Sequence, residues 1–585
     1  MKPASGICST GGAFARLGEN GRCGVILLLL FIISGFLPLG YSQEIVRPKH
    51  PPGAATKVPP ENLITFSRDL RTHQSLSSIS GQWEGMAQIG SIRPPDPHGA
   101  AGPKGIIATV NLRITYFAKS GAAIWGPVNL GTFWSSVTNT GNGLSDPRAI
   151  YDPGSGRFYV IMQENLTSQS FLNVAVSRNS NPTNSGASDW YFYRLQITES
   201  PGGVPTGGDY PGLGVDYQAV YVTYNMWTLP LTSSSSSFIN SQIIILNKSA
   251  LTNGTLTSIS GSVDTTGFSV KPVSVLGGNA PGNIAYFVET PLSTTTGVKI
   301  WAVGTPLTSP VLNSTSVTVP NNGGAPCPDA PQSGTANRLD TLAPETQGNA
   351  FWYNGAVWFC HTAGGSAGRA IVYYYKVNLN HYPSGTPTLA ESGGIDGGSG
   401  VWNFQPAIGG NAQGDVCLVF SQSSSSTFPT IMYTSRAAGA GSFETPTVLK
   451  ASTNQYNGSL DGTNCSMVQL RWGDYATVAA DPVDGSFWVC HEWAKTPANN
   501  NWSTWWGNIS ARTINNIIYV DLGSAWEYPD GSAAMPFPTV KQANAVAYNG
   551  NTIRIKNGHY PDAPISFAKQ LRVESTNGPA TIEGP

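Results

Sequence analysis

The stretch Arg471–Trp493, RWGDYATVAADPVDGSFWVCHEW, contains the unit from which most of the chain is built. It reads as a short strand, YATVAAD, then a turn rich in Pro, Asp and Gly, then a strongly aromatic strand, SFWVCHEW. Pro, Asp and Gly provide turn geometry that β-branched and aromatic residues adopt poorly. The stretch therefore predicts a β-hairpin.

Copies of this hairpin recur along the chain, for example DPRAIYDPGSGRFYVIMQE from Asp146 and QPAIGGNAQGDVCLVFSQ from Gln405. Successive copies begin 50 to 69 residues apart, at Asp96, Asp146, Asp209, Pro272, Asp340, Gln405 and Asp474. Several short strands in each of a series of such repeats are typical of propeller blades. A pair of β-sandwiches is the alternative, but sandwiches do not repeat one hairpin at near-constant spacing. The sequence therefore predicts an all-β chain with a seven-bladed β-propeller.

The composition supports this fold class and argues against some partners. Charged residues make up 11% of the chain, against about 25% in an average protein. The formal net charge is −1, so nothing indicates a nucleic-acid partner. Five cysteines follow the N-terminal region, so at most two disulfides can form and one thiol is left over. We expect Cys360 and Cys490 to be buried core thiols and not metal ligands, because the histidine that follows each one faces the opposite side of the strand.

The N-terminus resembles an export signal. Basic residues precede an apolar run at 25–39, and Gly40 and Ser42 suit cleavage after Ser42. A membrane anchor is the alternative, but the run is shorter than the roughly 20 residues that span a bilayer. We therefore predict a signal peptide at 1–42, a Pro-rich linker at 43–60, no stable membrane span after cleavage, and a secreted or cell-surface protein.

The propeller is expected to occupy 61–513. Only one strand follows SFWVCHEW before the composition changes, so blade seven lacks a strand. An open ring would expose two sheet edges, which proteins avoid. We expect the segment 61–90 to supply the missing strand by pairing with 502–513.

The tail, 514–585, has a different pattern. A short helix is expected at 538–548, followed by the short strands TIRIK, PISF, LRVES and ATIEG. Short strands at this spacing after a capping helix are typical of the first rungs of a parallel β-helix. With one or two rungs, the segment would be incomplete, so we expect a truncated gene product or a partner over its open end.

Two family resemblances follow from these motifs. PPDPHGAAGPKG, DPRAIYDPGSGRFYV and RWGDYATVAADPVDGSFW resemble secreted bacterial β-propeller proteins, which are related at fold level to the sialidase and neuraminidase-repeat group. This resemblance covers about 80–513, and the family's repeated Ser-x-Asp-x-Gly-x-x-Trp box is not matched. The tail resembles the opening of pectin-lyase-like right-handed β-helices, whose catalytic residues lie on later rungs.

Propeller ligands bind at the mouth of the central channel, so the starts of the first strands are the candidate site. The expected binding residues are Asp146, Asp209, Tyr210, Arg471, Asp474 and Tyr475. The alternative is that each aspartate only caps its own turn through backbone N–H groups.

The sialidase resemblance implies a second hypothesis. Such an enzyme has three arginines that clamp a carboxylate, a tyrosine nucleophile helped by a glutamate, and an acidic aspartate. The residues available for these roles are Arg148, Arg338, Arg471, Tyr475, Glu492 and Asp96.

No cofactor motif occurs in the sequence. A structural calcium ion at the acidic turn Asp481–Asp484 is the weaker alternative to an ordinary hairpin turn. The leading hypothesis is therefore an exported, non-catalytic propeller that binds an extracellular glycan or protein at its channel mouth. The alternative is a glycosidase that cleaves extracellular glycans at the same place.

Overall fold

The structure is a computed structural model, and it describes residues 78–582 apart from several short gaps. The gaps are 91, 139–142, 232–235, 257, 277–281, 321–327, 366–367, 458–459, 462–468, 497–500, 511–516 and 563–564. The predicted signal peptide and Pro-rich linker lie outside the described residues, as do Cys327 and Cys465, so the predictions about them stay predictions. Within the described part of the chain, no helix has the length and apolarity needed to cross a membrane.

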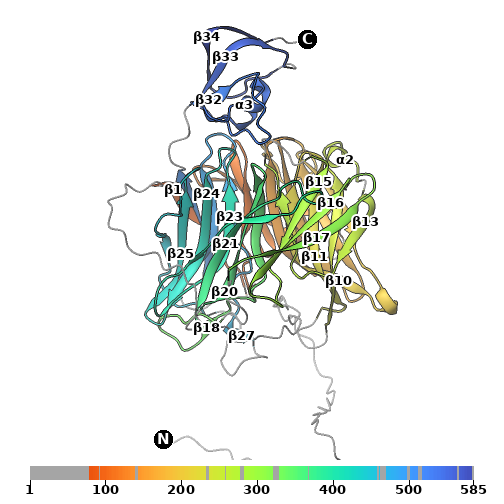
Figure 1. The fold of residues 1–585 in the computed structure, drawn as a ribbon. Coiled ribbons are helices and arrows are strands. Elements are labelled where there is room, and N and C mark those ends of the chain that lie inside the picture. The colour runs from red at the N-terminus through yellow and green to blue at the C-terminus, as the bar shows by residue number, and fades with distance from the viewer. Residues whose placement is uncertain are drawn as a thin grey trace, which may run out of the picture. The chain divides into compact units, whose positions relative to one another are not determined.

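Seven four-stranded antiparallel units form the blades of a propeller (Figure 1). Blade 1 consists of β2 (His98–Ala101), β3 (Gly105–Val110), β4 (Arg113–Ala118) and β5 (Ala123–Asn129). Blade 2 consists of β6 (Leu144–Asp152), β7 (Arg157–Asn165), β8 (Ser170–Ser177) and β9 (Trp190–Gln196). Blade 3 consists of β10 (Thr206–Val215), β11 (Ala219–Thr228), β12 (Phe238–Asn247) and β13 (Ser258–Thr265).

Blade 4 consists of β14 (Lys271–Ser274), β15 (Ile284–Glu289), β16 (Gly297–Gly304) and β17 (Val311–Thr318). Blade 5 consists of β19 (Thr346–Tyr353), β20 (Ala356–Gly364), β21 (Ala370–Asn378) and β22 (Thr388–Ile395). Blade 6 consists of β23 (Val401–Gly410), β24 (Val416–Ser424), β25 (Thr427–Arg436) and β26 (Thr447–Ala451). The expected seven-bladed all-β architecture is confirmed.

The N-terminal strand closes the ring. Blade 7 contains β29 (Thr477–Ala480), β30 (Phe487–Ala494), β31 (Trp502–Ser510) and, outermost, β1 (Ser78–Ala87). β1 pairs antiparallel with β31 from Ser78↔Ser510 to Ala87↔Ser503. This is the pairing expected from the strand missing in blade 7, and it leaves no unpaired edge on β31.

Apolar side chains from neighbouring blades pack against each other. One cluster joins Tyr159 and Leu172 of blade 2 to Val220 and Leu246 of blade 3, and all four are fully buried. The three cysteines that the structure describes, Cys360, Cys417 and Cys490, are buried and free. Burial raises the pKa of each thiol, which agrees with the expectation of core thiols.

Lys–Asp ion pairs join adjacent blades near their first turns. Lys248 Nζ lies 2.8 Å from Asp152 Oδ2 and joins blade 3 to blade 2. Lys119 Nζ lies 2.6 Å from Asp481 Oδ2 and joins blade 1 to blade 7. Each lysine follows the third strand of its blade, and each aspartate ends or directly follows the first strand of the preceding blade, so the same ion pair occurs at two of the blade junctions.

The expected start of blade 5 at Asp340 is wrong. Arg338–Leu339 forms β18, which pairs in parallel with β28 (Gln469–Leu470) in a small separate sheet completed by β27 (Leu460–Asp461). β18 and β27 lie at the lower end of the propeller in Figure 1. The first strand of blade 5 begins later, at Thr346, because the Pro-containing segment between Leu339 and Thr346 does not continue the ladder.

The tail contains three parallel strands and one helix. β32 (Ile517–Val520) pairs with β33 (Thr552–Tyr560), which pairs with β34 (Arg572–Ile582). The helix α3 (Val540–Val546) lies within the expected range and is capped by the Thr539 side chain. The prediction of four short strands is wrong: residues 572–575 and 580–582 belong to the single strand β34, and residues 565–567 do not form a strand. Asn577 (φ 63°) and Gly578 (φ 123°) make an irregularity within β34 instead of a turn.

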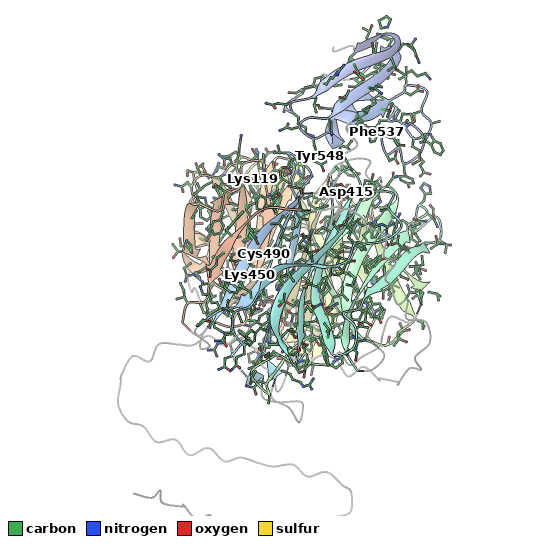
Figure 2. The ribbon with its side chains drawn as sticks, turned by 90° about the vertical axis from the view of Figure 1, so that its left-hand side faces the viewer. Lys119, Asp415, Lys450, Cys490, Phe537 and Tyr548 are labelled. Carbon is green, nitrogen blue, oxygen red and sulfur yellow. The ribbon has the colours of Figure 1, made fainter. Side chains whose placement is uncertain are left out.

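Tyr548 and its neighbours connect the tail to the first turns of blades 6 and 7 (Figure 2). The Ala412 N–H donates to Tyr548 Oη at 2.9 Å, and the Asn549 N–H donates to the Val483 carbonyl at 3.0 Å. The Tyr548 ring lies over Gly485, where an added Cβ would be 2.6 Å from Cε2. A side chain at this glycine would therefore collide with the ring.

Candidate binding channel

Several blades have a residue in the left-handed backbone region within the first strand or just before it. Asp96, Asp146, Tyr210 and Gln405 have φ values of 46°, 54°, 55° and 51°, and each is followed by proline. In blades 2, 3 and 6 the strand register shifts at this point, as in a β-bulge. Positive φ is uncommon outside glycine, and bulges redirect side chains. These repeats therefore share one backbone irregularity, and it sets the direction of the side chains next to the proline.

These side chains meet across the centre of the ring. Tyr475 of blade 7 donates to Asp146 Oδ2 of blade 2 at 2.8 Å. Arg148 Nη2 of blade 2 donates to Asn349 Oδ1 of blade 5 at 2.7 Å. The rings of Tyr210 and Tyr475 stack with centroids 5.2 Å apart. Since blades 2 and 5 are not neighbours, the Arg148 contact must cross the central channel.

Carboxylates surround this crossing point. The Asp474 N–H donates to Asp96 Oδ1 at 2.8 Å, and Arg471 Nη2 lies 3.0 Å from Asp474 Oδ2. Glu492 Oε2 accepts from the Gly473 N–H at 2.7 Å. Asp209 accepts from Gln163 Nε2 at 3.1 Å. The cluster is therefore held together mainly by its own hydrogen bonds.

Burial sets the protonation of these groups. It raises the pKa of Asp96 well above its usual value, and the nearby Asp474 and Asp146 raise it further. The pKa of Asp146 rises to about 7, first through burial and then through Asp209 and Asp474. Burial also raises the pKa of Glu492 well above its ordinary range. The Asp146 carboxyl is therefore mostly protonated near pH 6, and burial favours the neutral form of Asp96 and Glu492 as well.

The structure brings the six expected binding residues into one region, but it buries them. Their exposed fractions do not exceed 7%; they are Asp146, Asp209, Tyr210, Arg471, Asp474 and Tyr475. They lie in the channel interior rather than at an open mouth. The sequence shows which residues start the strands, but it does not show how deep in the channel those starts lie.

Of the residues proposed for a sialidase-like site, most lie in this cluster and one does not. Arg148 lies over the Tyr475 ring, 4.3 Å from its centroid. Arg338 instead donates to the Asp329 carbonyl at 2.9 Å, from the separate sheet that contains β18. The three arginines therefore have three different hydrogen-bond partners: Asn349, the Asp329 carbonyl and Asp474.

Three residues of the cluster were missed in the sequence. Lys271 Nζ donates to the Tyr210 carbonyl at 2.9 Å and lies 3.8 Å from the Tyr210 ring centroid. His98 Nδ1 accepts from the Ala149 N–H at 3.1 Å, and burial followed by Arg148 lowers its pKa well below the ordinary value. Asn349 binds Arg148. His98 and Lys271 could have been identified in the sequence, because each lies next to the proline of its repeat, as Arg148 does.

The other half of the channel is lined by small and apolar residues. The first strands of the ring run in one direction, so their later residues lie toward one end of the channel. A cavity there is lined by Gly99, Ala101, Ala149, Tyr151, Ser274, Leu276, Asn349, Phe351, Ile408, Gly410, Val478 and Ala479, among others. Asn349, Leu276 and Ala479 are only partly buried. This end is therefore the mouth that solvent reaches, and Asn349 separates it from Arg148.

The acidic turn at Asp481 has protein partners of its own. Asp481 Oδ1 accepts from the Val483 N–H at 2.9 Å, and Oδ2 accepts from Trp488 Nε1 at 2.9 Å and pairs with Lys119. Among the residues that the structure describes, no three His, Cys, Asp or Glu side chains form a group that could hold a metal ion.

Comparisons with known proteins find only distant structural similarities. No protein-family profile and no curated protein matches the sequence. A mutant of Synechocystis apocarotenoid oxygenase matches with a TM-score of 0.32 and 12% identity, over 59% of this chain and 69% of that chain. A subtype N10 neuraminidase-like protein of a little yellow-shouldered bat isolate matches with a TM-score of 0.31 and 11% identity, over 59% and 96%. A mutant Trypanosoma rangeli sialidase matches with a TM-score of 0.31 and 10% identity, over 72% and 60%. At these TM-scores the similarities carry no argument about activity.

Proposed function

We propose that this chain is an exported, non-catalytic β-propeller that binds a glycan at the solvent-reached mouth of its channel. The observation that carries the proposal is the division of the channel. The buried Asp, Glu and Arg side chains of the cluster lie on one side of Asn349, and the reachable side is lined mainly by glycine, alanine and aliphatic residues, together with Tyr151, Phe351 and Ser274. Aromatic faces with a few polar groups suit a binding site that fixes a ligand without reacting with it.

A panel of extracellular oligosaccharides, titrated by calorimetry, tests this function. Ala479 lines the mouth and is only partly buried, so Ala479→Leu should narrow the entrance while leaving the interior cluster intact. We expect saturable binding by the wild type, at least tenfold weaker binding by Ala479→Leu, and intact oligosaccharides afterwards. Equal binding by both proteins would place the ligand elsewhere, and no binding to any glycan would contradict the proposal.

A glycosidase is the second candidate, and the Tyr475–Asp146 hydrogen bond is the observation that favours it. A tyrosine beside a carboxylate is a pairing of nucleophile and base, and the Arg148 guanidinium lies over the tyrosine ring. Reducing-sugar release that disappears in Tyr475→Phe would establish this candidate in place of the first.

Export and the tail belong to the same proposal. Secreted material should begin at or near Gln43, which N-terminal sequencing tests, and full-length protein in membranes would contradict it. We also infer that the tail is the opening of a parallel β-helix. Its support is the in-register parallel pairing of β32, β33 and β34. A fragment of residues 516–585 that unfolds sharply as a monomer would contradict an incomplete solenoid.

A further inference from the structure

The tail is anchored beside the channel mouth at several points. Besides the Tyr548 and Asn549 contacts, Gln413 Nε2 of blade 6 donates to Asn551 Oδ1 at 2.9 Å. Glu527 Oε1 lies 2.7 Å from His381 Nε2, next to blade 5. The neighbouring Tyr528 ring meets Trp352 edge to face, with centroids 6.2 Å apart. These contacts join the tail to the turns of three blades.

A groove lies between the tail and these turns. Its propeller wall includes Trp352, Tyr353 and Asn354, and its tail wall includes Asp530 and Phe537. It shares Leu276, Phe351 and Gly410 with the lining of the channel cavity. The groove therefore adjoins the channel cavity, and a ligand in the groove would contact both parts of the chain.

The lining of the groove fits an uncharged, hydroxyl-rich ligand. Trp352 contributes a ring that is only 6% exposed and otherwise packs in the core of blades 4 and 5; its Nε1–H is itself buried and has no acceptor within the described residues. Asn354 and Asp530 are half-buried and place amide and carboxylate groups beside the aromatic rings. Among the residues that the structure describes, no lysine or arginine lines the groove, so none of them would neutralise an anionic ligand. Aromatic faces beside hydrogen-bonding groups suit the apolar faces and hydroxyl groups of a sugar.

We propose that the tail completes the binding site, and that Trp352, Asn354 and Asp530 form a subsite for a neutral sugar unit next to the channel mouth. This inference rests on the proposed glycan-binding function and names its ligand class. The subsite requires both walls, so the tail determines specificity and is not only a spacer.

Calorimetry on the full chain tests the subsite with neutral hexasaccharides of glucose, mannose and xylose and with hexagalacturonate as the charged comparison. Asn354→Gly removes the amide at a residue with φ 51°, where glycine is unstrained. Asp530→Asn removes the charge but keeps an oxygen for the Ser532 N–H that Asp530 Oδ1 accepts at 2.8 Å. Asn380→Gly is the matched control, because Asn380 has φ 48° but does not line the groove.

We expect a neutral hexasaccharide to bind, and both groove variants to weaken it by about threefold to tenfold, the loss of roughly one hydrogen bond. The control should bind like the wild type. Wild-type affinity in both groove variants, with binding retained, would overturn the subsite and leave the proposed function standing. Preference for hexagalacturonate would also overturn it, and no glycan binding at all would remove both proposals.

Discussion

Replacing Lys248 by methionine should destabilise the propeller far more than its distance from the channel suggests. Lys248 and Asp152 are 9% and 3% exposed, and their charged atoms lie 2.8 Å apart between blades 2 and 3. Lys248 Nζ also donates to the Asp216 carbonyl. Methionine keeps the apolar stem of lysine, so the change removes mainly the charge and its hydrogen bonds.

The expected loss in the free energy of unfolding arises because Lys248→Met leaves the Asp152 carboxylate buried without its ion-pair partner. Breaking a buried ion pair by removing one partner costs about 3–5 kcal/mol. Asp152 still accepts from the Gly154 and Ser155 N–H groups, both at 3.0 Å, so the lower end of that range applies. With an m-value on the order of 3 kcal/mol/M, the urea midpoint should fall by about 1 M.

Urea unfolding followed by circular dichroism measures this loss, with Lys495→Met as the control. Lys495 pairs with Glu84 at 33% and 39% exposure, and exposed pairs contribute about 0–1 kcal/mol. If both m-values are unchanged and Lys248→Met lowers the free energy of unfolding no more than Lys495→Met does, the buried ion pair does not stabilise the propeller as expected.

Three further predictions concern the channel, the thiols and the tail. The native state holds the Asp146 proton up to about pH 7, whereas the unfolded chain releases it near pH 4. The native state thus binds more protons between these values, so stability falls as pH rises through this window. From pH 5 to pH 8, the free energy of unfolding, measured by urea titration, should fall on the order of 3 kcal/mol less in Asp146→Asn than in the wild type. The same pH dependence in both proteins would contradict this. Mass-mapped alkylation should leave Cys360, Cys417 and Cys490 unmodified in the native protein and modify them in urea; native labelling would contradict their burial. Gly485→Val should increase hydrogen exchange in α3, because Gly485 (φ 73°) lies under the Tyr548 ring, whereas Gly439→Val (φ 76°), where an added Cβ meets nothing within 4 Å, should not; equal exchange in both variants would contradict the docking contact.

The blades could be predicted because each hairpin carries its own local signal. Turn residues at Asp152, Asp216 and Asp481 bind their own backbone N–H groups, so the pattern is visible in any one repeat. Ring closure could be predicted because a missing strand must be supplied from elsewhere. The start of blade 5 was misplaced because Arg338–Leu339 pairs with β28, about 130 residues away, and no local pattern encodes that partner.

The candidate site could be predicted only in part. The residue before the repeat's proline is distinctive, so Asp146, Tyr210 and Gln405 were placed correctly in the first strands of their blades, whereas Asp340 lies outside blade 5. Their burial was not predicted, since it depends on side chains such as Arg148 and Tyr475 that meet across the ring. The role of Asn349 in dividing the channel depends on blades 2 and 5 at once. Trp352 and Asp530 line one groove only because the tail folds back onto the blade turns.

The most direct test of non-catalytic binding at the channel mouth is one titration with recovery of the ligand. The wild-type protein is titrated with a neutral hexasaccharide that it binds, and the ligand is then analysed by mass spectrometry after prolonged incubation. We expect saturable one-to-one binding, which Ala479→Leu weakens at least tenfold. We also expect to recover the hexasaccharide at full length. Shortened products that require Tyr475, or binding that Ala479→Leu leaves unchanged, would contradict it.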